Sequence, residues 1–320
     1  MASIVKHGKG YRALVARKGI RRTKVFATRT EAKDWASRQE YLILNADKVA
    51  AEGTFGELLD RYAREVSPSK RGARWEVLRL AKIGRDKIAK VRLGDLSSTD
   101  FSDWRERRLR EVKPGTVVRE MQLMASVLNE ARKEWGLIGS NPMGDVRRPP
   151  KPPSRDRLPT EAELERLAHS AGDDLSTATA RAFHAFLFAL ETAMRAGEIV
   201  GLTWANVDIE SRVAHLPKTK NGHARDVPLS SEAVRLLRAL PEADPVFALN
   251  SQQLDALWRK VRDRAGVEGL TFHDSRHGGI TRLARKLDVL ALARMVGHRD
   301  IRMLSVYYNE TAAEMAKRLD

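Results

Sequence analysis

Hydrophobic and polar residues alternate along GYRALVARKGIRRTKVF, residues 10–26, in the pattern of two strands that each bury one face. Ala13 and Val15 fall on the same face of the first run, and a Lys-Gly pair separates this run from the second. Thr30 is placed to cap the helix that follows, TEAKDWASRQEYLIL. Residues 1–48 are therefore expected to form a small hairpin or sheet with one helix packed against it.

Residues 52–145 show the three-to-four-residue periodicity of helices instead. Pro68 and Gly72 interrupt the pattern and predict a turn between two helices. The clearest apolar stripe lies late in this segment and consists of Val117, Met121, Met124, Leu128, Ala131 and Trp135. We interpret this stripe as the core of a helical bundle rather than as a cofactor site.

The stretch DVRRPPKPPSRDRLP, residues 145–159, contains five prolines and five basic residues. Because proline favours extended chain, residues 146–159 are expected to form a semi-rigid basic linker. A mostly helical domain over 160–320 follows, opened by a capping box of Thr160 and Glu163. Within it, RVAHLP and RDVPL predict a short hairpin around an Asn-Gly turn. The expected fold class is mainly α with small antiparallel β elements.

Charge changes this picture by pointing to a partner. The chain has 58 Lys and Arg against 42 Asp and Glu, a net charge of +16, and residues 1–50 carry 12 basic and 4 acidic side chains. A polyanion is the natural partner, and nucleic acid is the commonest one. The alternative is a basic surface that only keeps the protein soluble.

Two groups of basic residues are candidates for contact with DNA. A two-stranded ribbon is narrow enough to enter the major groove, and the alternative is a solvated charged hairpin. A loop in the helical segment also leaves basic side chains free to meet phosphate. The candidates are Arg12, Arg17, Lys18, Arg21, Arg22 and Lys24 in the hairpin, and Lys70 and Arg71 in the loop.

Several classes of protein are disfavoured by composition. There is no cysteine, so disulfides and thiolate metal sites are excluded, and a reducing cytoplasm fits. No run of about 18 apolar residues is present for crossing a membrane, and the N-terminus lacks the apolar core of a secretion signal. We therefore expect a cytoplasmic protein that acts away from membranes.

The stretch TFHDSRHGGITR, residues 271–282, admits two kinds of chemistry. His273 and His277 are four apart and suit a metal on one helical face. A zinc protease would need Glu where Asp274 stands, no third ligand is evident by spacing, and Arg276 would place a cation beside the metal. Zinc hydrolysis is therefore disfavoured, whereas His273 and Arg276, three apart, suit a phosphate. Both histidines merely packing or capping a helix is the remaining alternative.

Four other stretches contain side chains that suit a phosphate. They are ETAMRAGEIVGLTW with Arg195, HLPKTKNGHARDVPL with Lys218 and Lys220, ARMVGHRD with His298, and LSVYYNE with the adjacent Tyr307 and Tyr308. A guanidinium matches two phosphate oxygens at once and keeps its charge. Each stretch taken alone also has an ordinary structural explanation, so it is their joint order along the chain that carries information.

In that order the residues resemble the signature of tyrosine recombinases, the phage integrase family. The resemblance covers at least residues 160–310. Residues 52–145 resemble the family's core-binding domain, and residues 1–48 resemble the arm-binding domain of phage integrases. The stretch from about 125 to 230 also resembles shufflon-type DNA invertases, which lack such an arm domain, so the N-terminus favours an integrase.

The resemblance implies a role for each matched residue. Arg195 and Arg276 would clamp the scissile phosphate, and Tyr307 would attack it and form a 3′-phosphotyrosine bond. His273 would accept or share the tyrosine proton. Lys220 on the hairpin would protonate the departing 5′-oxygen.

Five further residues complete the expected site or compete for a place in it. His298 would hydrogen-bond the phosphate, and Glu198 and His277 would have supporting roles. Lys218 ranks behind Lys220, and Tyr308 is the alternative nucleophile. The sequence departs from the family pattern at Ser275 and Gly278, and neither departure removes a catalytic group.

The resemblance also implies partners and a reaction. The protein would recombine double-stranded DNA at core sites, with arm sites and DNA-bending proteins as further expected partners. It would work as a homo-tetramer on DNA, with residues 311–320 docking on a neighbouring subunit, and it would need no cofactor, metal or ATP. Integration or excision of a phage or mobile element is the expected role. The alternatives are a shufflon-type invertase, a type IB topoisomerase or a non-catalytic DNA-binding protein.

Overall fold

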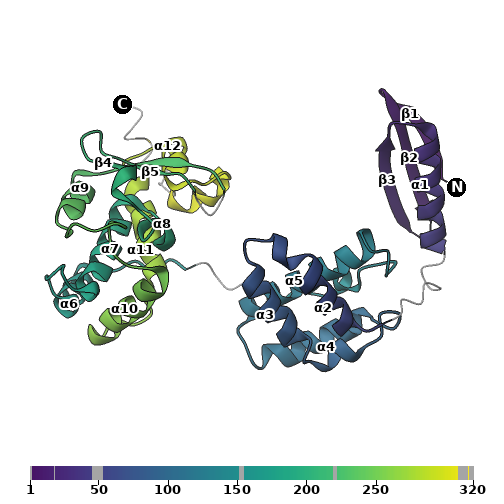
Figure 1. Ribbon diagram of the computed structural model, residues 1–320, viewed down its shortest axis with the longest axis horizontal. Helices are drawn as coiled ribbons and strands as arrows, with labels where there is room; N and C mark the ends of the chain where they lie inside the picture. The colour runs from purple at the N-terminus through teal and green to yellow at the C-terminus, as the bar shows by residue number, and fades with distance from the viewer. Residues whose placement is uncertain are drawn as a thin grey trace. The chain divides into compact units, whose positions relative to one another are not determined.

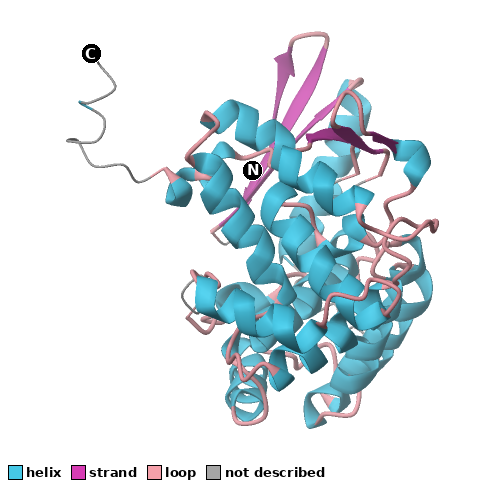
Figure 2. Cartoon of the chain, turned by 90° about the vertical axis from the view of Figure 1, so that its left-hand side faces the viewer, coloured by secondary structure: helices cyan, strands magenta, loops and turns pink. Residues whose placement is uncertain are grey.

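The computed structural model of the chain describes residues 2–17, 19–44, 53–150, 155–218, 222–308 and 316. The chain divides into two compact units, residues 1–153 and 154–320 (Figure 1). Most of the described chain is helical, and its strands form two small antiparallel sheets (Figure 2). The expected fold class is confirmed. None of the helices in the described residues has the length and apolar character needed to cross a membrane.

The N-terminal sheet has one strand more than the hairpin predicted from the sequence. Strands β1 (Ser3–His7), β2 (Gly10–Arg17) and β3 (Ile20–Phe26) pair antiparallel in that order, and α1 (Arg29–Leu44) packs against β2. The cap of α1 was predicted at the wrong threonine. Thr28 and Glu31 exchange backbone-to-side-chain hydrogen bonds of 3.2 Å, because the T-x-x-E box begins at Thr28 and not at Thr30.

The helical segment of the first unit is a bundle, as predicted. It contains α2 (Phe55–Glu65), α3 (Ala73–Ile83), α4 (Ser98–Leu109) and α5 (Pro114–Lys133). The predicted stripe on α5 lies in the core, since five of its members are 0% exposed: Val117, Met121, Met124, Leu128 and Ala131. Trp135 lies beyond the end of α5, so its assignment to the helix was wrong. Its ring nevertheless packs against Tyr62, with ring centroids 6.5 Å apart.

The second unit surrounds one long apolar helix. Its helices are α6 (Glu161–Ala171), α7 (Ala178–Thr192), α8 (Ala196–Ile199), α9 (Ser231–Arg238), α10 (Ser251–Arg264), α11 (Phe272–Ala284) and α12 (Val289–Val296). Strands β4 (Val207–Asp208), β5 (Val213–Leu216) and β6 (Arg225–Pro228) form its antiparallel sheet. The predicted capping box of α6 and the predicted short strands are confirmed.

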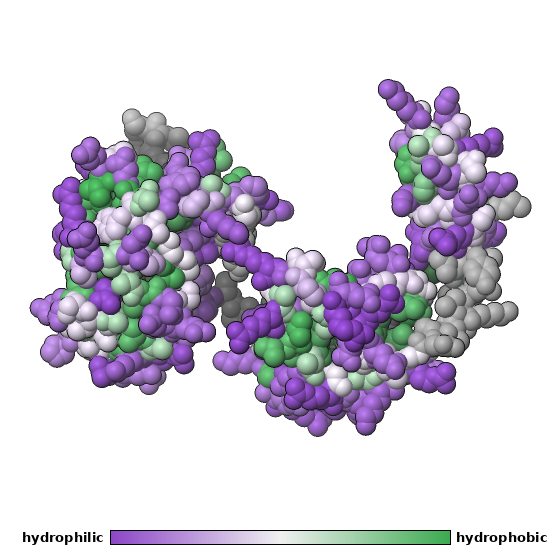
Figure 3. All heavy atoms as spheres, viewed as in Figure 1, coloured by the Kyte–Doolittle hydropathy of each residue, from purple (hydrophilic) through white to green (hydrophobic). Residues whose placement is uncertain are grey.

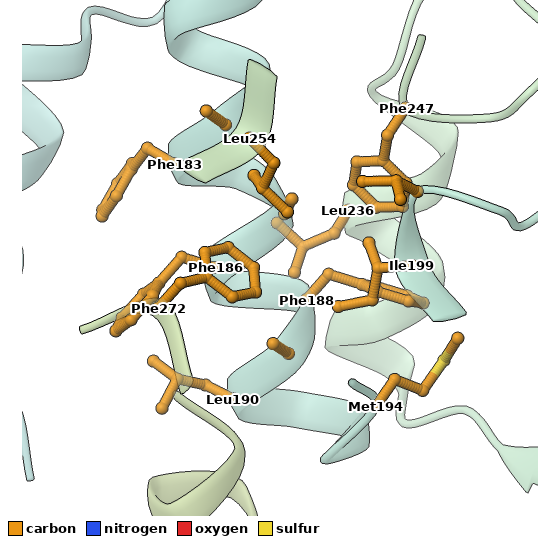
Figure 4. Packing of buried hydrophobic residues seen from close by; sticks show 14 of the residues in the cluster. Phe183, Phe186, Phe188, Leu190, Met194, Ile199, Leu236, Phe247, Leu254 and Phe272 are labelled. Carbon is orange, nitrogen blue, oxygen red and sulfur yellow. The ribbon is translucent and has the colours of Figure 1, made fainter. Parts of the chain in front are cut away.

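Among the described elements, helix α7 contributes more buried residues to the core of this unit than any other. Phe186 and Phe188 point from it toward Phe272 and Phe247, which come from later parts of the chain (Figure 4). The Phe186 ring stacks on Trp258 of α10 with centroids 4.1 Å apart. The N-terminal end of α11 is therefore fixed by apolar contacts before any charged group is considered.

Two adjacent glycines let α11 approach α7 closely. A Cβ atom added at Gly279 would lie 2.8 Å from the carbonyl oxygen of Ala189, and one at Gly278 would lie 2.8 Å from Cδ2 of Leu190. A backbone oxygen cannot yield as a flexible side chain can, so the side chain at 279 must be absent. At Gly278, where the sequence departs from the family pattern, the close atom is the end of a flexible leucine side chain, so this position is less strictly constrained.

The end of the chain and the linker are described only in part. Two short 3₁₀ turns, Ile301–Met303 and Ser305–Tyr307, follow α12. Apart from residue 316, the predicted C-terminal helix over 311–320 lies outside the described residues, as do linker residues 151–154. Hydrophilic residues cover much of the visible face around β1–β3, in agreement with the basic composition of that segment (Figure 3).

Candidate active site

An open cleft of about 820 Å³ in the second unit brings together residues that are far apart in the sequence. Five of the six residues matched to the family's catalytic set line it: Arg195, His273, Arg276, His298 and Tyr307. His277, matched to a supporting role, also lines it. The sixth, Lys220 on the β5–β6 hairpin, lies outside the described residues, and Lys218 is exposed on the same hairpin.

Arg195 stands where the chain turns from α7 into α8, as its sequence context predicted. Helix α7 ends at Thr192, its C-cap Ala193 has a left-handed φ of 50°, and Arg195 is the N-cap of α8. Its backbone N–H donates to Oε2 of Glu198 at 2.9 Å, and its Nη1 donates to Oε1 at 2.9 Å. The supporting carboxylate therefore fixes both the backbone and the guanidinium of Arg195.

Glu198 is shared by a second arginine that was not singled out from the sequence. Arg225 donates to Oε1 at 2.9 Å and to Oε2 at 2.7 Å, and both side chains are under 10% exposed. Burial alone would raise the pKa of Glu198, but hydrogen bonds from Arg225 and from the Arg195 backbone outweigh it and lower the pKa to about 2. The alternation of residues along the strand RDVPL could have indicated this, because Arg225 lies on the same inward face of the strand as Val227.

Arg276 is the most buried cation of the cleft, with 4% of its surface exposed. Its guanidinium donates to the carbonyl oxygen of Ala193 and, at 2.8 Å, to that of Val296. These carbonyls end α7 and α12, so Arg276 ties three helices together. Burial and the charge of Arg195 lower the pKa of Arg276 to about 9, so it keeps its proton at neutral pH.

The cluster carries more positive than negative charge. Three arginines, at positions 195, 225 and 276, are matched by one carboxylate, that of Glu198. The excess is about two positive charges at the floor of a cleft, which is the electrostatic setting for a bound anion. An arginine fork is also shaped for phosphate oxygens.

His298 adds a neutral ring to this cluster. Burial and the charges of Arg276, Arg195 and Arg225 lower the pKa of His298 to about 4. Its Nε2 lies 3.3 Å from Nη2 of Arg276. Its buried Nδ1 has no hydrogen-bond partner among the residues that the structure describes. An unsatisfied buried nitrogen costs stability, so a functional reason for it is expected.

Tyr307 and Tyr308 point in different directions, which separates the two candidate nucleophiles. The Tyr307 hydroxyl lies 2.9 Å from Nδ1 of His277, within the cleft. The Tyr308 hydroxyl donates at 2.7 Å to the carbonyl oxygen of Leu287, and its ring lines a different cavity. Burial raises the pKa of Tyr307, although the charge of Arg276 opposes the shift.

His277 is the histidine within hydrogen-bond distance of the Tyr307 hydroxyl, whereas the family resemblance implied the proton-accepting role for His273. His273 is exposed in the first turn of α11 and lines the cleft, but no hydrogen bond between it and Tyr307 is seen in the described structure. The reason is helical geometry. His277 lies one turn further along α11, where the 3₁₀ turn that carries Tyr307 packs.

The basic residues of the N-terminal sheet are divided between its two faces. The register pairs Ala13 with Lys24 and Val15 with Arg22, so these two cations lie on the side of the sheet that packs on α1. Arg17 lies on that side too and donates to Glu40 of α1 at 2.6 Å. The open face keeps Arg12 and Arg21, while Lys18 lies outside the described residues.

Lys70, one of the two predicted loop cations, has an acidic partner. Lys70 donates to Glu76 at 2.9 Å and to the Tyr62 hydroxyl at 2.6 Å. Partial burial would lower the pKa of Lys70, but these hydrogen bonds raise it overall. A carboxylate therefore already balances its charge, which weakens its case as a phosphate contact. Arg71 is exposed in the adjoining turn.

The arrangement does not provide a metal site among the described side chains. No three His, Asp or Glu residues converge in that part of the chain as ligands of an ion. His273 and His277 face a cleft floored by arginines, which suits an anion rather than a cation.

Comparisons with known proteins agree with the geometry. The model of the phage integrase family matches residues 158–314. A putative integrase/recombinase from Haemophilus influenzae is 40% identical over 98% of this chain and 89% of its own length. A shufflon-specific DNA recombinase from Escherichia coli is 37% identical over 82% of this chain and 70% of its own length.

Solved structures support the fold. A lambda integrase tetramer bound to a Holliday junction aligns with a TM-score of 0.68 at 17% identity, covering 93% of this chain and 92% of that one. The Tn1549 transposon integrase in complex with transposon right end DNA aligns with a TM-score of 0.66 at 19% identity, covering 83% and 100%. At such identities the likeness concerns the fold alone.

Proposed function

The chain belongs to the phage integrase family of tyrosine recombinases, and we propose that it cuts and rejoins DNA strands through a covalent 3′-phosphotyrosine intermediate on Tyr307. One observation carries this proposal. The Tyr307 hydroxyl lies 2.9 Å from a histidine nitrogen, in a cleft that also contains Arg195, Arg276 and His298. A nucleophile, a base and a set of phosphate-binding cations are thus in one place.

The first step is attack by the Tyr307 oxygen on a DNA phosphorus. Because burial raises the pKa of the phenol, it needs a base, and His277 Nδ1 is within hydrogen-bond distance. His273, exposed in the same cleft, is the second candidate for this proton, as the family resemblance implied. The P–O bond to the 5′-oxygen breaks as the phosphotyrosine bond forms.

Arg195 and Arg276 would stabilise the five-coordinate transition state. Their guanidinium groups are held by Glu198 and by helix-end carbonyls, so little reorganisation accompanies the increase in negative charge on the phosphate. His298 would donate a hydrogen bond to the same phosphate. An anion beside the ring would reverse the charge repulsion that now keeps it neutral.

The departing 5′-oxygen needs a proton, and Lys220 on the β5–β6 hairpin is proposed to supply it. The phosphotyrosine link conserves the energy of the phosphodiester, so religation needs no ATP. The 5′-hydroxyl of a partner strand then attacks this link and releases Tyr307. Atoms and protons balance over the cycle, because the second step is the reverse of the first.

Two DNA sites must meet for strands to be exchanged, so we propose a homo-tetramer on double-stranded DNA, with DNA-bending proteins as accessory partners. The lambda integrase neighbour, a tetramer bound to a Holliday junction, supports this assembly by analogy of fold. Residues 1–48 would contact arm sites through the open face of the sheet, where Arg12 and Arg21 lie.

Integration or excision of a phage or mobile element is the proposed role, and inversion of a DNA segment is the second candidate. The relative that covers 98% of this chain is a putative integrase/recombinase, which favours the first. The shufflon-specific recombinase, at 37% identity, favours the second. A plasmid assay separates them: an invertase acts on sites in opposite orientation within one molecule, whereas an integrase also joins two molecules.

The test of the reaction is covalent trapping. The protein is incubated with fragments of DNA that flank its gene, denatured, and the DNA that stays attached is sequenced. We expect attached fragments that share a short inverted repeat, with no attachment by Tyr307→Phe and retained DNA binding. Relaxation of supercoils without site preference would instead indicate a type IB topoisomerase. DNA binding without attached DNA from the unaltered protein would indicate a non-catalytic DNA-binding protein.

A further inference from the structure

Arg155 lies at the end of the proline-rich linker, three residues before the region matched by the phage integrase family model. Its side chain nevertheless lines the same cleft as Arg195 and Arg276. It reaches across 119 residues of sequence to Asp274 in the first turn of α11. The ion pair is two-pronged: Nε donates to Oδ1 at 3.0 Å, and Nη2 donates to Oδ2 at 2.7 Å.

Asp274 holds the start of the helix that carries the site. Its Oδ2 accepts hydrogen bonds from the backbone N–H and the hydroxyl of Thr271, at 2.7 and 2.9 Å, and so caps α11. Its carboxylate is 3% exposed. Burial alone would raise the pKa of Asp274, but the contacts with Arg155 and Thr271 lower it. A buried charge at this position therefore depends on the linker arginine.

The linker residues that follow Arg155 also pack on helices of the second unit. Arg157 donates to Glu163 of α6, and Leu158 and Pro159 lie within 4 Å of where a Cβ on Gly278 would be. Asp274 and Gly278 are four residues apart and share one face of α11. Residues 155–159 thus pack on the face of α11 that carries Asp274 and Gly278. This face adjoins the face that carries His273 and Arg276.

We propose that Arg155 is a positioning residue: through Asp274 it fixes the first turn of α11 and thereby the placement of His273 and Arg276 on the scissile phosphate. This inference rests on the proposed recombinase function for its effect on cleavage, but not for its effect on the helix. This role would give the linker a part in the reaction, because the last linker residues contact α11, the helix that carries His273 and Arg276.

The test compares Arg155→Gln, Arg155→Lys and Asp274→Asn with the unaltered protein, on the duplex recovered by covalent trapping. Arg155→Gln is expected to slow covalent adduct formation by on the order of 10- to 100-fold, since small misplacements of catalytic groups have effects of that size. The DNA dissociation constant should change by less than about threefold, because no phosphate contact is assigned to Arg155. Arg155→Lys, which keeps the charge, should recover part of the rate.

Hydrogen exchange of the amides in residues 272–278 gives a second readout that needs no DNA. Arg155→Gln should accelerate it on the order of tenfold, as local opening becomes easier. The matched control is Arg235→Gln, which also removes a two-pronged ion pair, in this case with Glu232, that is exposed within α9. The control should leave both exchange at α11 and adduct formation unchanged.

The double variant Arg155→Gln/Asp274→Asn separates positioning from direct contact with DNA. If Arg155 acts through Asp274, the double variant is no slower than Asp274→Asn alone. Additive losses, or unchanged exchange and unchanged adduct formation in Arg155→Gln, would overturn the inference. Should the unaltered protein trap no DNA, the proposed function would fail, while the exchange comparison would still decide whether Arg155 holds α11.

Discussion

Two buried glutamates, one in each unit of the protein, bridge pairs of arginines in nearly the same way. In the helical bundle, Glu120 accepts from Arg79 at 2.8 Å and from Arg108 at 2.8 and 3.0 Å. In the second unit, Glu198 accepts from Arg195 and Arg225. The carboxylates are 2% and 6% exposed, so both are desolvated and depend on their arginines.

The two clusters differ in their balance of charge. In the bundle a second carboxylate, Glu111, also accepts from Arg108, so two arginines face two glutamates. In the cleft, Arg276 adds a third arginine to this cluster, and the other two carboxylates that line the cleft, Asp274 and Asp300, are paired with Arg155 and Arg302 instead. A balanced cluster contributes to the fold alone, whereas excess positive charge beside a cleft is a binding site for an anion. This difference supports the proposal that the cleft binds the phosphate.

The largest predicted effect is a loss of cleavage when the excess positive charge in the cleft is removed. Arg276→Gln should reduce covalent adduct formation on the order of 1,000-fold, because a fixed cation at the developing charge is removed. DNA binding by filter retention should persist, since it depends on many other basic residues. Cleavage within tenfold of the unaltered protein, with the fold checked by circular dichroism, would contradict the assignment of Arg276 to the phosphate.

Next in size is the comparison of the two glutamates themselves. Glu120→Gln leaves Arg108, 7% exposed, without its main carboxylate, and should lower the free energy of unfolding by about 3 kcal/mol. Adduct formation per folded molecule should stay unchanged. Glu198→Gln should lower the free energy of unfolding by a comparable amount, because the buried charge of Arg225 is left without a carboxylate. It should also reduce cleavage, because the carboxylate no longer holds the guanidinium of Arg195.

Urea unfolding of the full-length variants measures the change in the free energy of unfolding. Adduct formation, measured at urea concentrations below the unfolding transition, gives the change in cleavage. The comparison fails if Glu120→Gln loses cleavage as strongly as Glu198→Gln, or if Glu198→Gln keeps full cleavage. In either case the two clusters would not divide into one that supports the fold and one that supports the reaction.

A smaller effect concerns pH, through His298. Its pKa is about 4 in the folded protein, below the value of about 6.5 expected when unfolded. The unfolded chain therefore binds a proton first as pH falls, so stability is present above pH 6.5 and is lost progressively toward pH 4. His298→Gln should have a shallower loss over that window. Unfolding curves from pH 7 to 4 test this, and equal slopes in both proteins would contradict the burial of His298 beside the arginines.

The smallest effect is expected at the N-terminal sheet, where single exposed cations are proposed to contact DNA. Arg21→Ala, on the open face, should reduce the dependence of log affinity on log salt by about one unit for arm-site DNA. Arg17→Ala is the matched control, because Arg17 is paired with Glu40 of α1. Equal changes in the two variants would show that the open face is not the one that meets DNA.

Patterns of apolar residues predicted the fold class because burial depends on periodicity, which the sequence displays directly. The stripe on α5 and the strands β5 and β6 are examples. The cap of α1 and the end of α5 were misplaced by two residues each, since caps depend on local hydrogen bonds that several nearby residues can make.

The candidate site was predicted as a set of residues but not as a network. The family resemblance implied Arg195, Arg276, His298 and Tyr307, and these residues meet in the cleft. Spacing could not show that Arg225 shares Glu198, because that ion pair joins β6 to α8 across 27 residues. Nor could it show that His277 rather than His273 contacts Tyr307, which depends on how the 3₁₀ turn packs on α11.

The most direct test of the central claim is to locate the DNA bond on the protein. The covalent adduct is digested with nuclease and protease, and the peptide that contains both adjacent tyrosines is fragmented in a mass spectrometer. The account predicts a nucleotide on Tyr307, whose hydroxyl faces the arginines of the cleft. A nucleotide on Tyr308, or an adduct formed equally well by Tyr307→Phe, would contradict it.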